Sequence, residues 1–178
     1  MKKQIILITL IMPMLSNASE KAFTPTPPGN IEIKTIPKQH LLIAQQTENY
    51  FIANNSLFGK LFRYIRTHNI PMTTPVKAEI NPGKMGFYIN ADNHQKEFPS
   101  TAAIQPVIEP AYTVLSIGKR GGYSEKNFQE THQKLVQHLA TLPDWQPAGE
   151  AYAIYWNGPY IPNFAKHFEV HIPIQSTP

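Results

Sequence analysis

The sequence predicts a single α+β domain over residues 31–176, built from two βαββ units whose two main helices pack on one side of antiparallel sheets. The prediction rests on two amphipathic helical segments, each preceded by one strand-like segment and followed by two. A composition of 42% hydrophobic and 11% aromatic residues is typical of a globular protein. The chain contains no cysteine, so its core must be stable without disulfide bonds.

The first 18 residues have the pattern of a cleavable secretory signal peptide. Two lysines near the start are followed by a mostly apolar segment over residues 5–15, and small residues stand at Ser16 and Ala18. The apolar segment is shorter than the roughly 20 residues that a membrane-spanning helix needs. We therefore expect a mature protein that begins at Ser19, keeps no stable membrane anchor, and is periplasmic or secreted.

The charge of the chain argues against nucleic acid as a partner. The chain has 16 basic and 12 acidic residues, which give a formal net charge of +4. Removal of Lys2 and Lys3 with the signal peptide would leave 14 basic residues, so the net charge of the mature chain would be +2. The longest basic cluster of the mature chain is the pair Lys119 and Arg120. A nucleic-acid-binding protein needs a concentrated basic face with interleaved aromatic residues.

The first elements along the chain are an arm and a strand region. Residues 19–30 are rich in proline, and the stretch from Ala22 to Gly29 has no apolar periodicity, so we expect a linker or a loosely held arm. Apolar residues around 31–33 and 41–43 then predict two short strands, or one strand broken at Pro37.

An amphipathic helix of about three turns is predicted next. Polar residues 54–56 offer N-caps, and the helix is expected to end near Asn69, before Pro71. Its apolar residues recur at helical spacing, and all of them, Phe62 included, are expected to be buried: Leu57, Phe58, Leu61, Phe62 and Ile65.

Strand-like segments surround a second helix in the remainder of the chain. Residues 75–80 and 85–90 predict a hairpin that turns at residues 81–83, and after a polar loop residues 107–118 predict a further strand. Ser124 is placed to cap the second helix. The predicted buried stripe of this helix is Phe128, His132, Leu135, Val136 and Leu139. Two final strands are expected over residues 150–156 and 167–174.

Two segments of this pattern carry a family resemblance. The helix LFGKLFRYI at Leu57–Ile65, followed by MTTPV at Met72–Val76, resembles the SOUL heme-binding family, whose members carry an F-x-x-L-x-x-Y-I helix and then M-T-x-P-V. The stretch FEVHIPI at Phe168–Ile174 is similar to the closing strand of that family, with Phe168 where asparagine is usual. YWNGP at Tyr155–Pro159 stands where the family has an aromatic strand end and a proline-containing loop. The resemblance spans residues 31–174.

The resemblance implies a function as well as a fold. It implies the duplicated βαββ barrel of gyrase-inhibitor-like ligand-binding domains, and noncovalent binding of heme or another planar apolar tetrapyrrole rather than catalysis. Two alternatives stay open: a gyrase-inhibitor-like receptor for aromatic or cationic small molecules, and a small hydrolase that uses Glu169 and a tyrosine. No catalytic residue and no metal site is assigned.

The closing strand supplies three candidate binding residues. His167, Glu169 and His171 alternate with apolar residues and therefore share one face, which lies toward a cleft or toward solvent. A solvated polar strand face is the more common explanation of such a pattern. Two neighbours in this set could share a metal ion, since alternate residues of a strand are about 6.6 Å apart.

The remaining candidates complete a predicted ligand cleft. The gyrase-inhibitor-like resemblance implies an acidic residue at the floor of the ligand groove, which matches Glu169. Tyr152 and Trp156 are aromatic residues that either wall such a pocket or pack in the core. His132 lies on the same face as Phe128 and is either an axial ligand for heme iron or an ordinary histidine at the edge of the core. The candidate binding residues are therefore Glu169, His171, His167, Tyr152, Trp156 and His132.

Overall fold

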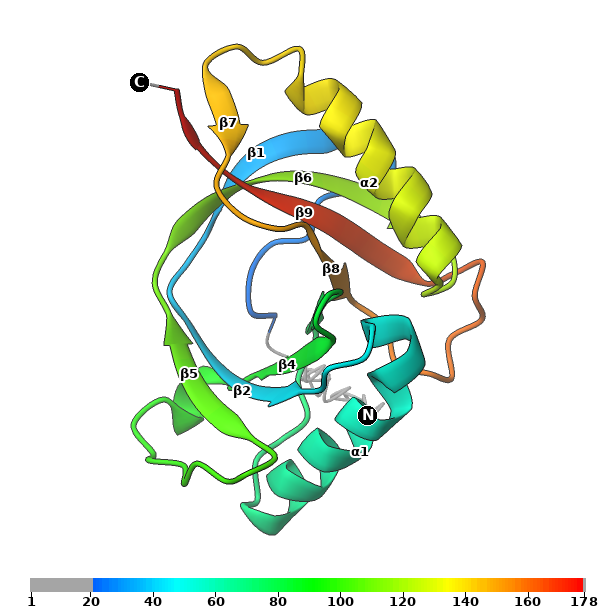
Figure 1. The fold of residues 1–178 in the computed structure, drawn as a ribbon. Coiled ribbons are helices and arrows are strands. Elements are labelled where there is room, and N and C mark those ends of the chain that lie inside the picture. Colours follow the sequence, from blue (N-terminus) through cyan, green and yellow to red (C-terminus); the bar gives the residue numbers. More distant parts are fainter. Residues whose placement is uncertain (1–20, 178) are drawn as a thin grey trace, which may run out of the picture.

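The computed structural model describes residues 21–177, and the expected signal peptide over residues 1–18 lies outside the described residues. A nine-stranded antiparallel sheet curls into an open barrel, and two helices pack against its outer, convex face (Figure 1). The concave face of the sheet encloses a space that the amino-terminal segment enters (Figure 1).

Two units of similar order make up the chain, and the second has one extra short strand. The first unit consists of β1 (Ile31–Ile36), β2 (Gln39–Gln45), α1 (Tyr50–Thr67), β3 (Val76–Glu79) and β4 (Lys84–Tyr88). After a short 3-10 helix, η1 (Ala91–Asn93), the second unit consists of β5 (Gln105–Glu109), β6 (Tyr112–Arg120), α2 (Glu125–Leu139), β7 (Trp145–Pro147), β8 (Tyr152–Tyr155) and β9 (His167–Ser176). The predicted α+β fold with two helices and duplicated units is confirmed, and each unit has two strands before its helix, the first of which pairs with the other unit.

The strand order shows how the units are joined. The strand order of the sheet is β1-β6-β9-β8-β3-β4-β2-β5. The paired strands β8 and β9 of the second unit and β3 and β4 of the first unit lie at its centre, where β3 pairs with β8. The first strand of each unit pairs with the other unit: β1 with β6, and β5 with β2. The short strand β7, which the sequence did not predict, pairs with β9. The predicted strand over residues 107–118 is two strands, because Pro110 lies at the corner between β5 and β6.

Helix α1 begins earlier than predicted. The side chain of Asn49 caps it by accepting a hydrogen bond of 2.8 Å from the backbone N–H of Phe51. The buried residues therefore form the stripe Tyr50, Ala53, Leu57, Leu61, Tyr64 and Ile65. The prediction that Phe62 is buried is wrong, because this side chain is 40% exposed and stacks on Phe58 at the flank of the helix.

Helix α2 begins where the sequence predicted. The Ser124 side chain accepts a hydrogen bond of 3.2 Å from the backbone N–H of Asn127. Phe128, Leu135 and Leu139 are buried as predicted, but Val136 is 47% exposed, and Thr131 takes the buried place between the apolar turns.

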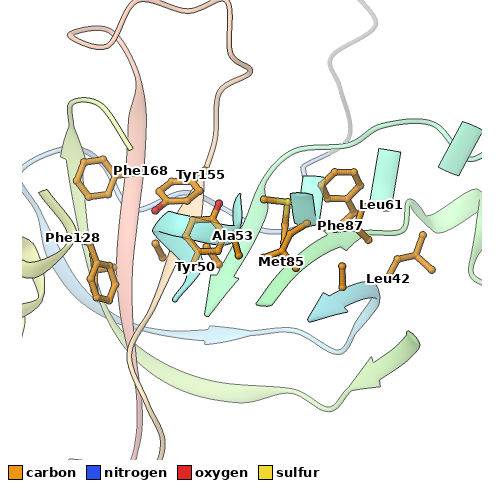
Figure 2. Packing of buried hydrophobic residues seen from close by; sticks show 14 of the residues in the cluster. Leu42, Tyr50, Ala53, Leu61, Met85, Phe87, Phe128, Tyr155 and Phe168 are labelled. Atoms are coloured by element: carbon orange, nitrogen blue, oxygen red, sulfur yellow. The ribbon is translucent and has the colours of Figure 1, made fainter. Parts of the chain in front are cut away.

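Apolar clusters cover both faces of the sheet. Figure 2 shows the larger cluster, to which both helices and the strands contribute side chains, among them Leu61 of α1, Phe128 of α2, Phe87 of β4 and Phe168 of β9. A smaller cluster lies on the concave face and includes Tyr88 and Trp156. Strand β8 is consequently buried on both faces along its whole length.

The amino-terminal arm, Ala22–Gly29, is held against the concave face. Thr26 is fully buried, and Phe23 packs against the smaller apolar cluster. The prediction of a loosely held arm is therefore wrong. The arm lacks apolar periodicity, but side chains of the sheet hold it through hydrogen bonds to its backbone.

Candidate functional site

A groove opens between the two units. Its volume of about 730 Å³ lies in the range of small-molecule sites. Helix ends, turns and strand β9 contribute its apolar walls, chiefly Phe51, Pro82, Pro110, Phe128, Pro173 and Ile174. Such a concave, partly apolar surface is typical of a ligand-binding site.

The charged residues of the groove are mostly acidic. Lys77 Nζ lies 2.7 Å from Glu109 Oε1 and 3.3 Å from Glu79 Oε1, and Lys84 Nζ lies 2.9 Å from Glu79 Oε2. Both lysines of the groove are thus paired, while Glu125 and Glu150 add further negative charge to its lining. The second carboxylate oxygen of Glu109, Oε2, is buried and has no hydrogen-bond partner among the described residues.

His132 of α2 lies on the wall of this groove, beside Phe128. Burial lowers its pKa below the ordinary value of 6.5, although Glu150 acts in the opposite direction. The imidazole is therefore neutral at pH 7, which is the form that binds a metal ion.

The interior of the curled sheet is called the chamber here; it is filled by packed side chains of the sheet, among them Lys34, Tyr88, Trp156, Glu169 and His171, and by Phe23 and Thr26 of the arm. Glu169 and His171 of β9 are both fully buried in it. The strand alternation thus turns both side chains to the inside of the sheet, and the solvated strand face is not what the structure shows.

Glu169 is surrounded by hydrogen-bond donors. Its Oε1 atom accepts from Trp156 Nε1 at 2.6 Å and from the backbone N–H of Thr26 at 3.0 Å. Its Oε2 atom accepts from three side chains, namely Lys34 Nζ at 2.6 Å, His171 Nε2 at 2.7 Å and Ser116 Oγ at 2.9 Å. A buried carboxylate is stable only with such a set of partners.

These partners determine the protonation states in the chamber. Burial raises the pKa of Glu169, but His171 and the Lys34 ammonium outweigh it and bring the pKa to about 2. Burial lowers the pKa of His171 below 6.5, although Glu169 opposes this shift. At neutral pH a carboxylate therefore faces a neutral imidazole whose Nε2–H donates to it, and Lys34 supplies the balancing charge.

A chain of hydrogen bonds links the chamber to the groove. The Tyr152 hydroxyl donates to His171 Nδ1 at 3.0 Å, and the Tyr112 hydroxyl lies 2.7 Å from that of Tyr152. Both tyrosines also line the groove, so they lie between the groove and the chamber. Burial raises the pKa of Tyr152 well above 10, so its hydroxyl stays protonated and serves to orient His171.

The structure brings five of the six candidate residues together. Tyr152, Trp156, Glu169 and His171 meet in the chamber. His167 lies at its mouth, where Nε2 donates to the Thr26 carbonyl at 2.9 Å. His132 is separate from them and lines the groove.

Three partners of Glu169 were not expected from the sequence: Thr26, Lys34 and Ser116. Lys34 and Ser116 face inward on β1 and β6, which pair directly, but lie far from Glu169 in the chain. The alternation of side chains along β1 indicates which face of the sheet Lys34 is on, but it does not indicate which residue Lys34 contacts.

Within residues 21–177, no group of three or more histidine, cysteine or acidic side chains is arranged to hold a metal ion. No helix in the same range is long and apolar enough to cross a membrane.

The sequence matches a family model. The model described as "SOUL heme-binding protein" matches residues 9–173, which is nearly the whole chain. No curated protein is similar enough in sequence to be counted as a relative.

Several solved structures share the fold. The EcmrR C-terminal domain has a TM-score of 0.66 at 13% identity, covering 83% of this chain and 98% of that one. In the complex of EcmrR with DNA, this chain spans only 58% of the EcmrR chain, at 12% identity and a TM-score of 0.67. A structure from Listeria innocua described as a hydrolase has a TM-score of 0.56 at 12% identity and covers 84% of this chain and 94% of that one. At such identities the likeness shows the fold alone.

Proposed function

Because the chain belongs to the SOUL heme-binding protein family, which supports a ligand-binding role, we propose that it binds heme or another tetrapyrrole noncovalently in the groove between its two units. The observation that carries the proposal is the groove itself, which has apolar walls from both units and a neutral histidine, His132, on one side. Attachment through thioether bonds is excluded, because the chain has no cysteine.

The charges of the groove favour one orientation of heme. The anionic propionates would be repelled by the acidic residues, so they should point to solvent or toward Lys84, which is partly exposed at the rim. The apolar macrocycle would then lie against the Phe51 side of the groove wall, where Phe51 and Phe128 contact each other, and the imidazole of His132 is the axial ligand that the groove offers to the iron.

The proposal is tested by titrating hemin into the protein and recording the Soret band. We expect saturable binding, a shifted Soret maximum in His132→Ala, and affinity lower by about tenfold in that variant, equivalent to about 1.4 kcal/mol. His138→Ala is the matched control, because this histidine lies on the same helix outside the groove lining and should leave the spectrum unchanged. Hemin uptake that never saturates would contradict the proposal.

A second candidate ligand for the same groove is an aromatic cation. The specific observation is Glu109, whose buried Oε2 atom lacks a partner, together with the excess of acidic residues around it. A structure of the same fold, at 8% identity and a TM-score of 0.50 over 82% of this chain and 94% of that one, was solved with bound tetraphenylphosphonium. A buried, unpaired carboxylate oxygen is costly, and a cationic or donor group would satisfy it.

Calorimetry with tetraphenylphosphonium and with hemin distinguishes the two ligands. Glu109→Gln should weaken binding of the cation by about tenfold while leaving hemin binding unchanged or improved, because the substitution removes negative charge. Glu97→Gln, at an exposed position outside the groove, serves as the control. Equal loss of both ligands would indicate damage to the groove rather than a charge effect.

We also propose that residues 1–18 direct export and are removed after Ala18. The order of lysines, apolar segment and small residues supports this proposal. Intact mass spectrometry of the exported protein should give the mass of residues 19–178, and a mature protein that retains Met1 would contradict it.

A further inference from the structure

The arm, Ala22–Gly29, crosses the open side of the chamber: Phe23 and Thr26 point into it, Thr26 is fully buried, and Thr24 and residues 27–29 are exposed. Figure 1 shows it as the blue segment within the ring of strands. Its only backbone pairing with the sheet in the described part of the chain consists of isolated bridges, such as Pro28 with Gly118. The arm is therefore held mainly by side chains of the sheet.

Side chains of the sheet bind the backbone of the arm at alternate residues. Gln39 Nε2 donates to the Ala22 carbonyl at 3.1 Å, Lys34 Nζ donates to the Thr24 carbonyl at 3.1 Å, and His167 Nε2 donates to the Thr26 carbonyl. The N–H of Thr26 donates in turn to Glu169. Contacts to alternate residues are the way in which a receptor recognises an extended peptide.

Two side chains of the arm occupy separate subsites. The Phe23 ring lies among aromatic groups, with centroid distances of 5.3 Å to Trp156, 5.7 Å to Tyr88 and 6.0 Å to His171. These separations and the near-perpendicular ring planes toward Trp156 and Tyr88 are favourable aromatic geometry.

The second subsite holds the hydroxyl of Thr26. Thr26 Oγ1 donates to Glu32 Oε1 at 2.6 Å, lies 2.7 Å from Ser116 Oγ, and accepts from Lys34 Nζ at 2.8 Å. Gly118 lies against this part of the arm, where a Cβ atom would collide with the backbone of residues 26 and 27. The sheet is thus shaped to admit a peptide backbone at this point.

The chamber does not depend on the arm to satisfy its charges. If the arm left, Glu169 would keep four of its five donors, all of them from the sheet. Three prolines, at positions 25, 27 and 28, restrict the free arm to extended conformations, so little entropy is lost or gained when it docks or leaves. Departure of the arm would therefore leave no buried charge without a partner.

We propose that the chamber is a peptide-binding site, and that the arm is its intramolecular ligand. A peptide of the same chemistry, with an aromatic residue followed at the third position by threonine and with proline between them, would bind there in place of the arm. The site is distinct from the groove, because Tyr112 and Tyr152 lie between them, and the inference is independent of the proposed function.

The test uses the full chain and a fluorescent peptide with the sequence of residues 21–30, followed by anisotropy. A tethered arm acts at an effective concentration on the order of 1 mM, so the wild-type protein should not bind micromolar peptide. The double variant Phe23→Ala, Thr26→Ala weakens its own arm and should bind the peptide saturably. A peptide that carries the same two alanines should not bind, whereas one with Thr24→Ala, an exposed position, should bind normally.

Absence of peptide binding by the folded double variant would overturn the proposal, and so would equal binding of the doubly substituted peptide. Hydrogen exchange of the wild-type protein gives an answer even if the variant does not fold. The Thr26 N–H should exchange at least about 100-fold faster than the central amides of β9, because the arm opens locally. Equal protection would mean that the arm leaves only when the whole protein unfolds, and would refute the inference. Neither outcome affects the hemin titration.

Discussion

Glu169 is the residue on which the interior depends most. It is a fully buried carboxylate, and its five donors come from the arm, β1, β6, β9 and the end of β8. The ion pair with Lys34 does not by itself add much stability, since both groups lose their hydration. Removal of one partner, however, leaves the other charge buried and unpaired.

Glu169→Ala should therefore lower the free energy of unfolding by about 3–5 kcal/mol. Denaturant unfolding measures the effect, with Glu97→Ala as the control at an exposed position, where a change within about 0.5 kcal/mol is expected. A small loss in Glu169→Ala would show that water fills the chamber and hydrates Lys34.

His171 makes stability depend on pH. Its folded-state pKa lies below 6.5, so the unfolded chain takes up a proton first, and stability is lost as the pH falls below 6.5. Glu169 adds a second loss at lower pH, between its ordinary pKa of 4.5 and its folded value of about 2. We expect the melting temperature to fall between pH 7 and pH 5, and less steeply in His171→Gln.

The slope should not vanish in that variant. Burial also lowers the pKa values of His167, His132 and His40, so these residues keep part of the pH dependence. A slope in His171→Gln equal to that of the wild type would mean that the pKa of His171 is the same in the folded and unfolded protein, and would contradict the prediction.

The sequence could predict where these side chains point but not what they touch. Strand alternation separates Glu169 and His171 from Phe168 and Val170, and the structure has that separation. The donors from Thr26 and Lys34 are 143 and 135 residues away in the chain. Such contacts follow from the strand order, which local periodicity does not contain.

At the scale of elements, the start of helix α1 was predicted several residues too late because of a run of polar residues. Residues 54–56 offer three N-capping side chains, but Asn49 is the cap, because the helix continues through them on its outer side. The earlier start adds Tyr50 and Ala53 to the buried stripe and identifies Leu57 and Leu61, rather than Phe58 and Phe62, as its centre.

Two neighbouring substitutions test this register. Leu61 is fully buried, so Leu61→Ala should cost about 2–5 kcal/mol of unfolding free energy. Phe62→Ala removes a larger side chain that is 40% exposed, and should cost less than about 1 kcal/mol. The comparison of denaturation midpoints is decisive, since a larger loss in Phe62→Ala would place the buried face elsewhere.

The helix cap can be tested in the same way. Asn49→Ala removes the acceptor for the Phe51 N–H and should cost about 1 kcal/mol. Asn55→Ala, at an exposed position inside the same helix, replaces a weaker helix former and should be neutral or slightly stabilising. If Asn55→Ala were the costlier change, the helix would begin near the position that the sequence suggested.

At the scale of the whole molecule, the two units exchange their first strands. The duplication was predictable from the order of strand and helix patterns, whereas the exchange was not, because β1 and β5 carry no signal that names their partners. The short proline-containing corners after β1 and β5 carry the chain from one half of the sheet to the other. Each half therefore includes a strand from the other unit, and neither half is complete alone.

The last prediction follows from this exchange: the chain should unfold in one cooperative transition, in spite of its two units. Both tryptophans, Trp145 and Trp156, lie in the second unit, so their fluorescence reports on that unit, while far-UV circular dichroism reports on both helices. Leu57→Ala lies in the first unit and should lower stability by about 2–5 kcal/mol. Because β1 and β5 tie the units together, this substitution should move the fluorescence and dichroism midpoints equally. A fluorescence midpoint that stays at the wild-type value would show that the second unit holds its structure without the first.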